Sequence, residues 1–120
     1  MKRILLDQNA PVGLRDILKE FEVSTAHALG WGAYSNGDLI KAAEQAGFEV
    51  LITADKNLRY QQNLASRKIS IIVLGSNRGE TVKASGMAII STVTTATPGT
   101  VIEILTEEAV SRVRMPDRPR

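Results

Sequence analysis

The sequence has no cysteine, a single histidine and only 4% aromatic residues in a chain of 120 residues. Without cysteine it can form neither disulfides nor thiolate metal sites, and it has no thiol nucleophile. Because His27 is the only histidine, metal sites with several imidazoles and acid–base schemes with two histidines are also excluded. The side-chain groups that remain as metal ligands are mainly carboxylate and amide oxygens.

The sequence also lacks a long apolar run and a strong excess of charge of one sign. No segment approaches the roughly 20 apolar residues of a membrane-spanning helix, and the N-terminus does not resemble a secretory signal. We therefore expect a cytoplasmic protein. The formal net charge of +2 permits a polyanionic partner without requiring one. The length predicts one domain over residues 1–114, followed by a disordered tail over 115–120.

Short apolar blocks alternate along the chain with segments of helical period, which is typical of βαβ units. Strands are expected over 3–6, 22–25, 48–52 and 69–74. Helices are expected over 11–21, 36–46, 59–65 and from 82 to about 93, the second with a buried stripe of Leu39, Ala42, Ala43 and Ala46. Two further strands over 100–105 and 109–114 predict a C-terminal antiparallel β-hairpin. The whole pattern predicts an α/β fold with a mostly parallel central sheet.

Three aspartates occur where this topology places a ligand site. Asp7 and Asp55 directly follow apolar strands, and Asp38 lies at the start of a helix. In open parallel sheets the ligand crevice lies beyond the carboxyl ends of the strands, so the three acids are expected to converge. Gathered carboxylates repel one another unless a cation neutralises them, and Mg²⁺ or Mn²⁺ prefer such oxygen ligands.

Each acid taken alone has a simpler interpretation. An aspartate after a strand is a common turn residue, and an acid such as Asp38 in the first helical turn is favoured by the helix dipole. Two other α/β classes are excluded near Asp7. Receiver domains need a pair of adjacent acids after the first strand, and dehalogenase-like phosphatases need Asp-x-Asp, but Gln8 and Asn9 follow Asp7 here. Trp31 and Tyr34 are compatible either with base stacking or with packing of their loop on the core.

Three segments resemble the PIN-like domains of bacteria, which are relatives of the VapC-type toxin ribonucleases. They are Ile4-Leu5-Leu6-Asp7-Gln8-Asn9, then Gly30-Trp31-Gly32 with Asn36-Gly37-Asp38, and finally Thr53-Ala54-Asp55-Lys56-Asn57-Leu58. The similarity covers about residues 1–77. It implies a three-layer α/β/α fold whose acids bind Mg²⁺ or Mn²⁺ for the hydrolysis of RNA phosphodiester bonds. It also allows an antitoxin protein as a partner.

The resemblance assigns roles by position. Asp7, Asp38 and Asp55 match the catalytic, metal-binding acids. Asn57 stands where many PIN domains have a further acid; its amide oxygen can coordinate a metal but brings no charge. The residues expected to contact RNA are Asn9, Lys56, Arg59 and Gln62.

Two functional classes stay open at this point. The first is a metal-dependent endoribonuclease, which the resemblance allows to be the toxin of a toxin–antitoxin pair. The second is a noncatalytic PIN-like module that binds RNA or a protein and keeps its acids for the fold. The sequence is compatible with a homodimer and does not name the RNA target.

Overall fold

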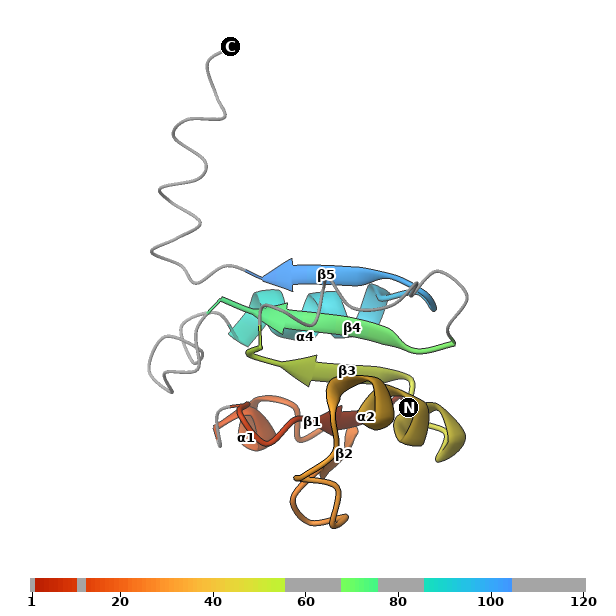
Figure 1. Cartoon of the computed structure of the whole chain (residues 1–120). Helices are drawn as coiled ribbons and strands as arrows, with labels where there is room; N and C mark the ends of the chain where they lie inside the picture. Colours follow the sequence, from red (N-terminus) through yellow and green to blue (C-terminus); the bar gives the residue numbers. More distant parts are fainter. Residues whose placement is uncertain (1, 11–12, 56–67, 76–85, 105–120) are drawn as a thin grey trace.

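The described part of the chain contains one sheet of five strands, in the order β2-β1-β3-β4-β5, and every neighbouring pair is parallel (Figure 1). This computed structural model describes residues 2–10, 13–55, 68–75 and 86–104. The strands are β1 (Arg3–Leu6), β2 (Glu22–Thr25), β3 (Val50–Thr53), β4 (Ser70–Leu74) and β5 (Val101–Ile104). The sheet is thus wholly parallel where it is described, and the five predicted strands that fall in the described residues are confirmed to within two residues at each end.

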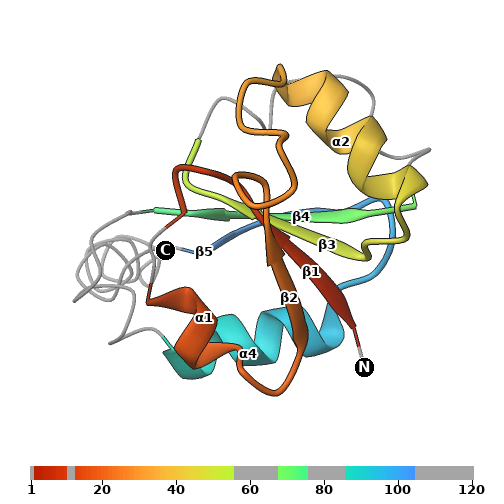
Figure 2. The ribbon, with the colours of Figure 1, turned by 90° about the horizontal axis from the view of Figure 1, so that it is seen from below.

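Helices cover both faces of this sheet. α2 (Asn36–Gln45) lies on one face, and α1 (Leu14–Ile17) and α4 (Gly86–Thr95) lie on the other, as Figure 2 shows. The fold is therefore a three-layer α/β/α arrangement, as the resemblance implied. None of the helices in the described ranges has the length and apolar character needed to cross a membrane.

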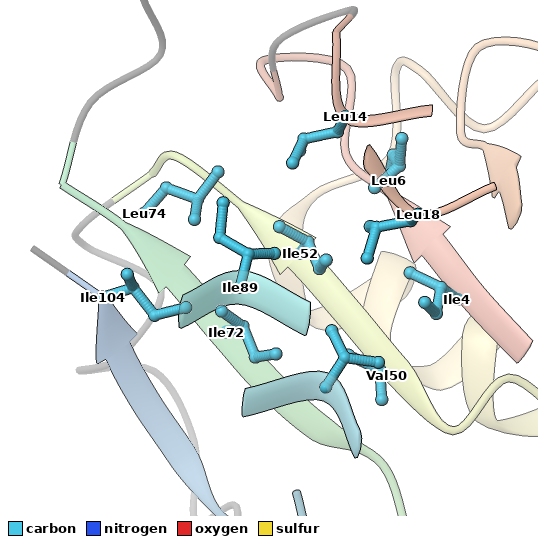
Figure 3. Packing of buried hydrophobic residues seen from close by; sticks show 11 residues of the cluster. Ile4, Leu6, Leu14, Leu18, Val50, Ile52, Ile72, Leu74, Ile89 and Ile104 are labelled. Carbon is cyan, nitrogen blue, oxygen red and sulfur yellow. The ribbon is translucent and has the colours of Figure 1, made fainter. Parts of the chain in front are cut away.

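Alternate side chains of the strands supply two separate cores. Ile4, Ile52 and Ile72 point to the face of α1 and α4, where they pack with Leu14 and Ile89 (Figure 3). The residues between them in sequence point to the face of α2, where they form a second cluster: Leu5, Leu51, Ile71 and Val73. Because helices cover both faces, all residues of β3 and β4 are buried, which explains their continuous apolar runs.

The first predicted helix is only partly helical. α1 has four residues, but the predicted apolar face is present, since Leu14 and Leu18 are buried and Ile17 and Phe21 pack against the same cluster. Burial therefore follows the helical period over a longer stretch than the helix itself.

The start and end of α2 follow local signals. The Ser35 hydroxyl accepts a hydrogen bond from the Asp38 N–H and caps the helix, and Gly47 follows it at a φ of +89°, which suits glycine. The predicted buried stripe is wrong in part, because Ile40 is buried whereas Ala46 is exposed. Leu39 and Ile40 are both buried, so the face of α2 that packs on the sheet is centred nearer these large side chains. Ala46, at the end of the helix, lies outside that face.

The last helix, α4, extends two residues beyond its predicted end at about residue 93, through a run of β-branched residues. Thr92, Thr94 and Thr95 each donate a hydroxyl hydrogen bond to the carbonyl four residues earlier, at 2.7, 2.8 and 3.0 Å. These bonds satisfy the hydroxyls within the helix. A turn at Pro98-Gly99 follows the helix, and β5 then runs parallel to β4. The second strand of the predicted hairpin, the helix over 59–65 and the tail over 115–120 lie outside the described residues.

A single lysine joins the sheet to the C-terminal end of α4. The Lys2 ammonium donates hydrogen bonds to the carbonyl oxygens of Val93 and Ala96, at 2.9 and 2.8 Å. Carbonyls at a helix C-terminus lack intrahelical donors and carry partial negative charge, so a cation stabilises them.

We expect Lys2→Met to lower the free energy of unfolding by about 1–2 kcal/mol, since it removes both charged hydrogen bonds but keeps an apolar stem. Urea denaturation measures the change. Lys41→Met is the matched control, because Lys41 is exposed on α2 and has no hydrogen-bond partner in the described ranges. Equal losses in the two variants would contradict the stabilising role of Lys2.

Candidate functional site

The site lies where β1 and β3 end. These strands are neighbours in the sheet, and the Asp7 N–H extends their pairing by donating to the Ile52 carbonyl at 2.9 Å. Asp7 therefore lies beside the last residue of β3, Thr53. Asp55 follows two positions later. Parallel pairing thus brings two of the three predicted acids to the same edge, although they are far apart in sequence.

The fully buried Thr53 hydroxyl connects these segments. It donates to Asp7 Oδ2 at 2.7 Å, accepts from the Asp55 N–H at 3.0 Å and also lies 3.2 Å from Asn9 Oδ1. A hydroxyl has one proton, and the shorter distance and the carboxylate charge favour Asp7 as its acceptor. Asn9 Oδ1 instead accepts from the Ala54 N–H at 3.0 Å. The loop after β1 is therefore fastened to the loop after β3 by two side chains.

The N-terminus of α2 is fastened to the same edge. Asn36, its first residue, donates through Nδ2 to Asp55 Oδ2 at 3.0 Å. Asp7 is held on its other side, where Oδ1 accepts from the Gln8 N–H at 2.7 Å. Both carboxylates are half-buried, so their orientations are set by the protein as well as by water.

Asp38 occupies a different environment. It lies in the first turn of α2, its N–H donates to the capping Ser35 hydroxyl at 3.3 Å, and its side chain is exposed. No group of three or more His, Cys, Asp or Glu side chains in the described ranges is close enough to share a metal ion. Within the described residues, hydrogen bonds therefore join Asp7, Asn9 and Asp55 in one network. Asp38 lies outside this network. The other predicted site residues, Lys56, Asn57, Arg59 and Gln62, lie outside the described ranges.

Sequence reasoning missed two members of the network, Thr53 and Asn36. Thr53 is β-branched and ends an apolar strand, so its residue type is explained by the strand alone. Asn36 begins α2, and an asparagine at the start of a helix is common without any role in a site. A polar residue completing an otherwise apolar strand, two positions before an acid, was the available signal for Thr53.

The aromatic residues have separate roles. Trp31 stacks on Tyr34 with ring centroids 6.1 Å apart, and it meets Phe48 edge-on at 6.3 Å. Trp31 also packs against the core cluster on the α2 face, which supports the packing interpretation for this residue. Tyr34 is 46% exposed and so keeps one ring face near solvent.

Comparison of the chain with protein-family models, with curated proteins and with solved structures gave no match. The arguments for function therefore rest on the residues and their geometry.

We expect Thr53→Val to lower the free energy of unfolding by about 1–3 kcal/mol, because it leaves the Asp55 N–H and the Asp7 carboxylate without their partner. Thr53→Ser keeps the hydroxyl and loses one buried methyl, at a cost of about 1 kcal/mol. Urea denaturation of both variants compares the two losses. A serine variant less stable than the valine variant would show that packing, and not the hydroxyl, matters at this position.

Proposed function

We propose that this chain is a metal-dependent endoribonuclease of PIN-like type, working in the cytoplasm on RNA phosphodiester bonds. The observation that carries the proposal is the joining of Asp7 and Asp55, at the carboxyl ends of neighbouring parallel strands, through the buried Thr53 hydroxyl. A carboxylate pair at this edge of an α/β sheet is where ligand chemistry is expected. The resemblance to PIN-like domains adds the reaction type.

The donor set suits a hard divalent cation. Asp7 and Asp55 offer carboxylate oxygens, and Asn9 lies in the same network with an amide oxygen. Mg²⁺ is commonly held by one or two protein carboxylates, with water and substrate phosphates completing its octahedron. Two acids are therefore enough for one ion. Each carboxylate oxygen that accepts one hydrogen bond keeps a further lone pair for a ligand.

The residues of the chain would act mainly by positioning. Thr53 and the Gln8 N–H hold the Asp7 carboxylate from two sides, and Asn36 holds that of Asp55. Preorganised charge of this kind needs little rearrangement when negative charge grows on a phosphate. A bound metal ion would supply an activated water and neutralise that charge. No side-chain nucleophile is required.

The second candidate is a noncatalytic module that binds RNA or a protein. Two observations favour it: the absence of a three-acid group from the described ranges, and an asparagine at position 57 in place of an acid. Pairing with an antitoxin protein and formation of a homodimer are compatible with either candidate.

Asp7→Asn and Asp55→Asn are each expected to reduce Mn²⁺-stimulated cleavage of single-stranded RNA by about 100- to 1000-fold, because each removes a charge that acts at the scissile phosphate. Asp55→Asn should leave thermal stability unchanged or raise it, because it relieves carboxylate repulsion. Asp7→Asn should lower it slightly, because its amide has one acceptor oxygen where the Asp7 carboxylate uses two. Glu20→Gln, on an exposed residue after α1, is the control and should cleave normally.

Cleavage that survives in either aspartate variant, or in EDTA, would contradict this mechanism. Calorimetric titration of Mn²⁺ separates the two candidates. Metal uptake that is lost in Asp7→Asn supports the nuclease, whereas no uptake by the wild-type protein supports the noncatalytic module.

Asp38→Asn is expected to have a smaller effect, with cleavage reduced less than about 10-fold, because Asp38 is exposed and its N–H bonds only to the capping Ser35 hydroxyl, outside the network of Asp7 and Asp55. The same Mn²⁺-dependent assay measures it. A loss as large as that of Asp7→Asn would show that Asp38 reaches the reacting phosphate during turnover.

A further inference from the structure

A cavity of about 240 Å³ adjoins Asp7 on the side away from Asp55. It lies at the carboxyl ends of β1 and β2, whose last residues, Leu6 and Thr25, are register partners. Leu6 and Ala10 give it apolar walls, and Arg15 from α1 and His27 from the loop after β2 supply nitrogen donors. Asp7 is therefore shared between the acidic network and this cavity.

The two donors are available to a ligand. Arg15 and His27 are both exposed, and neither side chain has a hydrogen bond or ion pair with another residue in the described ranges. By contrast, the ion pair that these ranges do contain, Arg3 with Glu22 at 3.3 Å, fastens β1 to β2 near the opposite end of the sheet. Within the described residues, the charge of Arg15 is thus not paired with another side chain.

Arg15 also lines a second, more open hollow of about 580 Å³ that continues along α1 and the edge of β2. Lys19 contributes a further cation to it, Asp16 partly offsets these charges, and Phe21 and Val23 give it apolar surface. Arg15 therefore lines two adjoining hollows. A chain of repeated anionic units could occupy both with Arg15 at the junction.

We propose that the cavity beside Asp7 is a nucleotide subsite for single-stranded RNA, with one phosphate bound by Arg15 and His27 and the strand continuing past Lys19. This inference rests on the proposed function for its substrate class. The planar guanidinium matches phosphate oxygens through two parallel hydrogen bonds. The apolar walls suit a ribose or base face. The volume accommodates one splayed nucleotide unit and not a stacked duplex, whose bases are turned inward.

Binding of a fluorescein-labelled single-stranded RNA, followed by fluorescence anisotropy in EDTA, tests the subsite without any contribution from metal or cleavage. Arg15→Gln is expected to weaken binding by about 10-fold. It should also reduce the slope of log affinity against log salt by about 0.7, the value for one lost phosphate contact on a single strand. His27→Gln should weaken binding less, because glutamine keeps a donor.

Lys41→Gln is the matched control, since it removes one exposed positive charge from α2 on the opposite face of the sheet. It should leave both affinity and salt slope nearly unchanged. Equal losses in Arg15→Gln and Lys41→Gln would overturn the subsite and indicate general attraction to a basic surface. Equal affinity for a duplex of the same sequence, or no RNA binding by the wild-type protein, would overturn it as well.

The failure of the subsite is distinguishable from the failure of the nuclease. RNA binding that depends on Arg15, in a protein that does not cleave with Mn²⁺, supports the subsite and contradicts the catalytic proposal. Mn²⁺-dependent cleavage with unchanged KM and kcat in Arg15→Gln overturns the subsite and leaves the catalytic proposal in place.

Discussion

A buried hydroxyl must be hydrogen-bonded, and at Thr53 this requirement organises the edge of the sheet where function is proposed. The hydroxyl has no access to water, so its partners have to come from the protein. They are the Asp7 carboxylate on one side and the Asp55 N–H on the other. The loops after β1 and β3 are consequently held in one arrangement before any ligand arrives.

The direction of the strands divides the molecule into two ends with different roles. At the amino ends, charged side chains complete the fold: Lys2 binds the terminal carbonyls of α4, and Arg3 pairs with Glu22. At the carboxyl ends, polar side chains from the loops after β1 and β3, from the end of β3 and from the start of α2 bind one another. This asymmetry is the physical basis for placing the chemistry at one edge.

The proposed site and the proposed subsite share Asp7 but come from different elements. Asn36 of α2 and Thr53 of β3 hold the acids, whereas α1 and the loop after β2 supply Arg15 and His27. The Asp7 and Asp55 carboxylates attract a cation, and the Arg15 guanidinium in the cavity beside Asp7 attracts phosphate. A phosphodiester that binds together with a metal ion requires negative groups for the metal and a positive group for the phosphate. The neighbouring carboxylates and Arg15 are therefore complementary to such a ligand.

The sequence by itself determined the five described strands, the parallel α/β architecture and the extent of α2 to within one residue, because apolar runs and helical periods are local properties of neighbouring residues. It also placed Asp7 and Asp55 at one edge, since parallel strands end together. Only the tertiary structure decided that Thr53 joins them, that Asp38 faces solvent and that Arg15 meets His27 across a cavity. These features depend on strand register and on the rotation of each helix over the sheet, which arise from packing between segments distant in sequence.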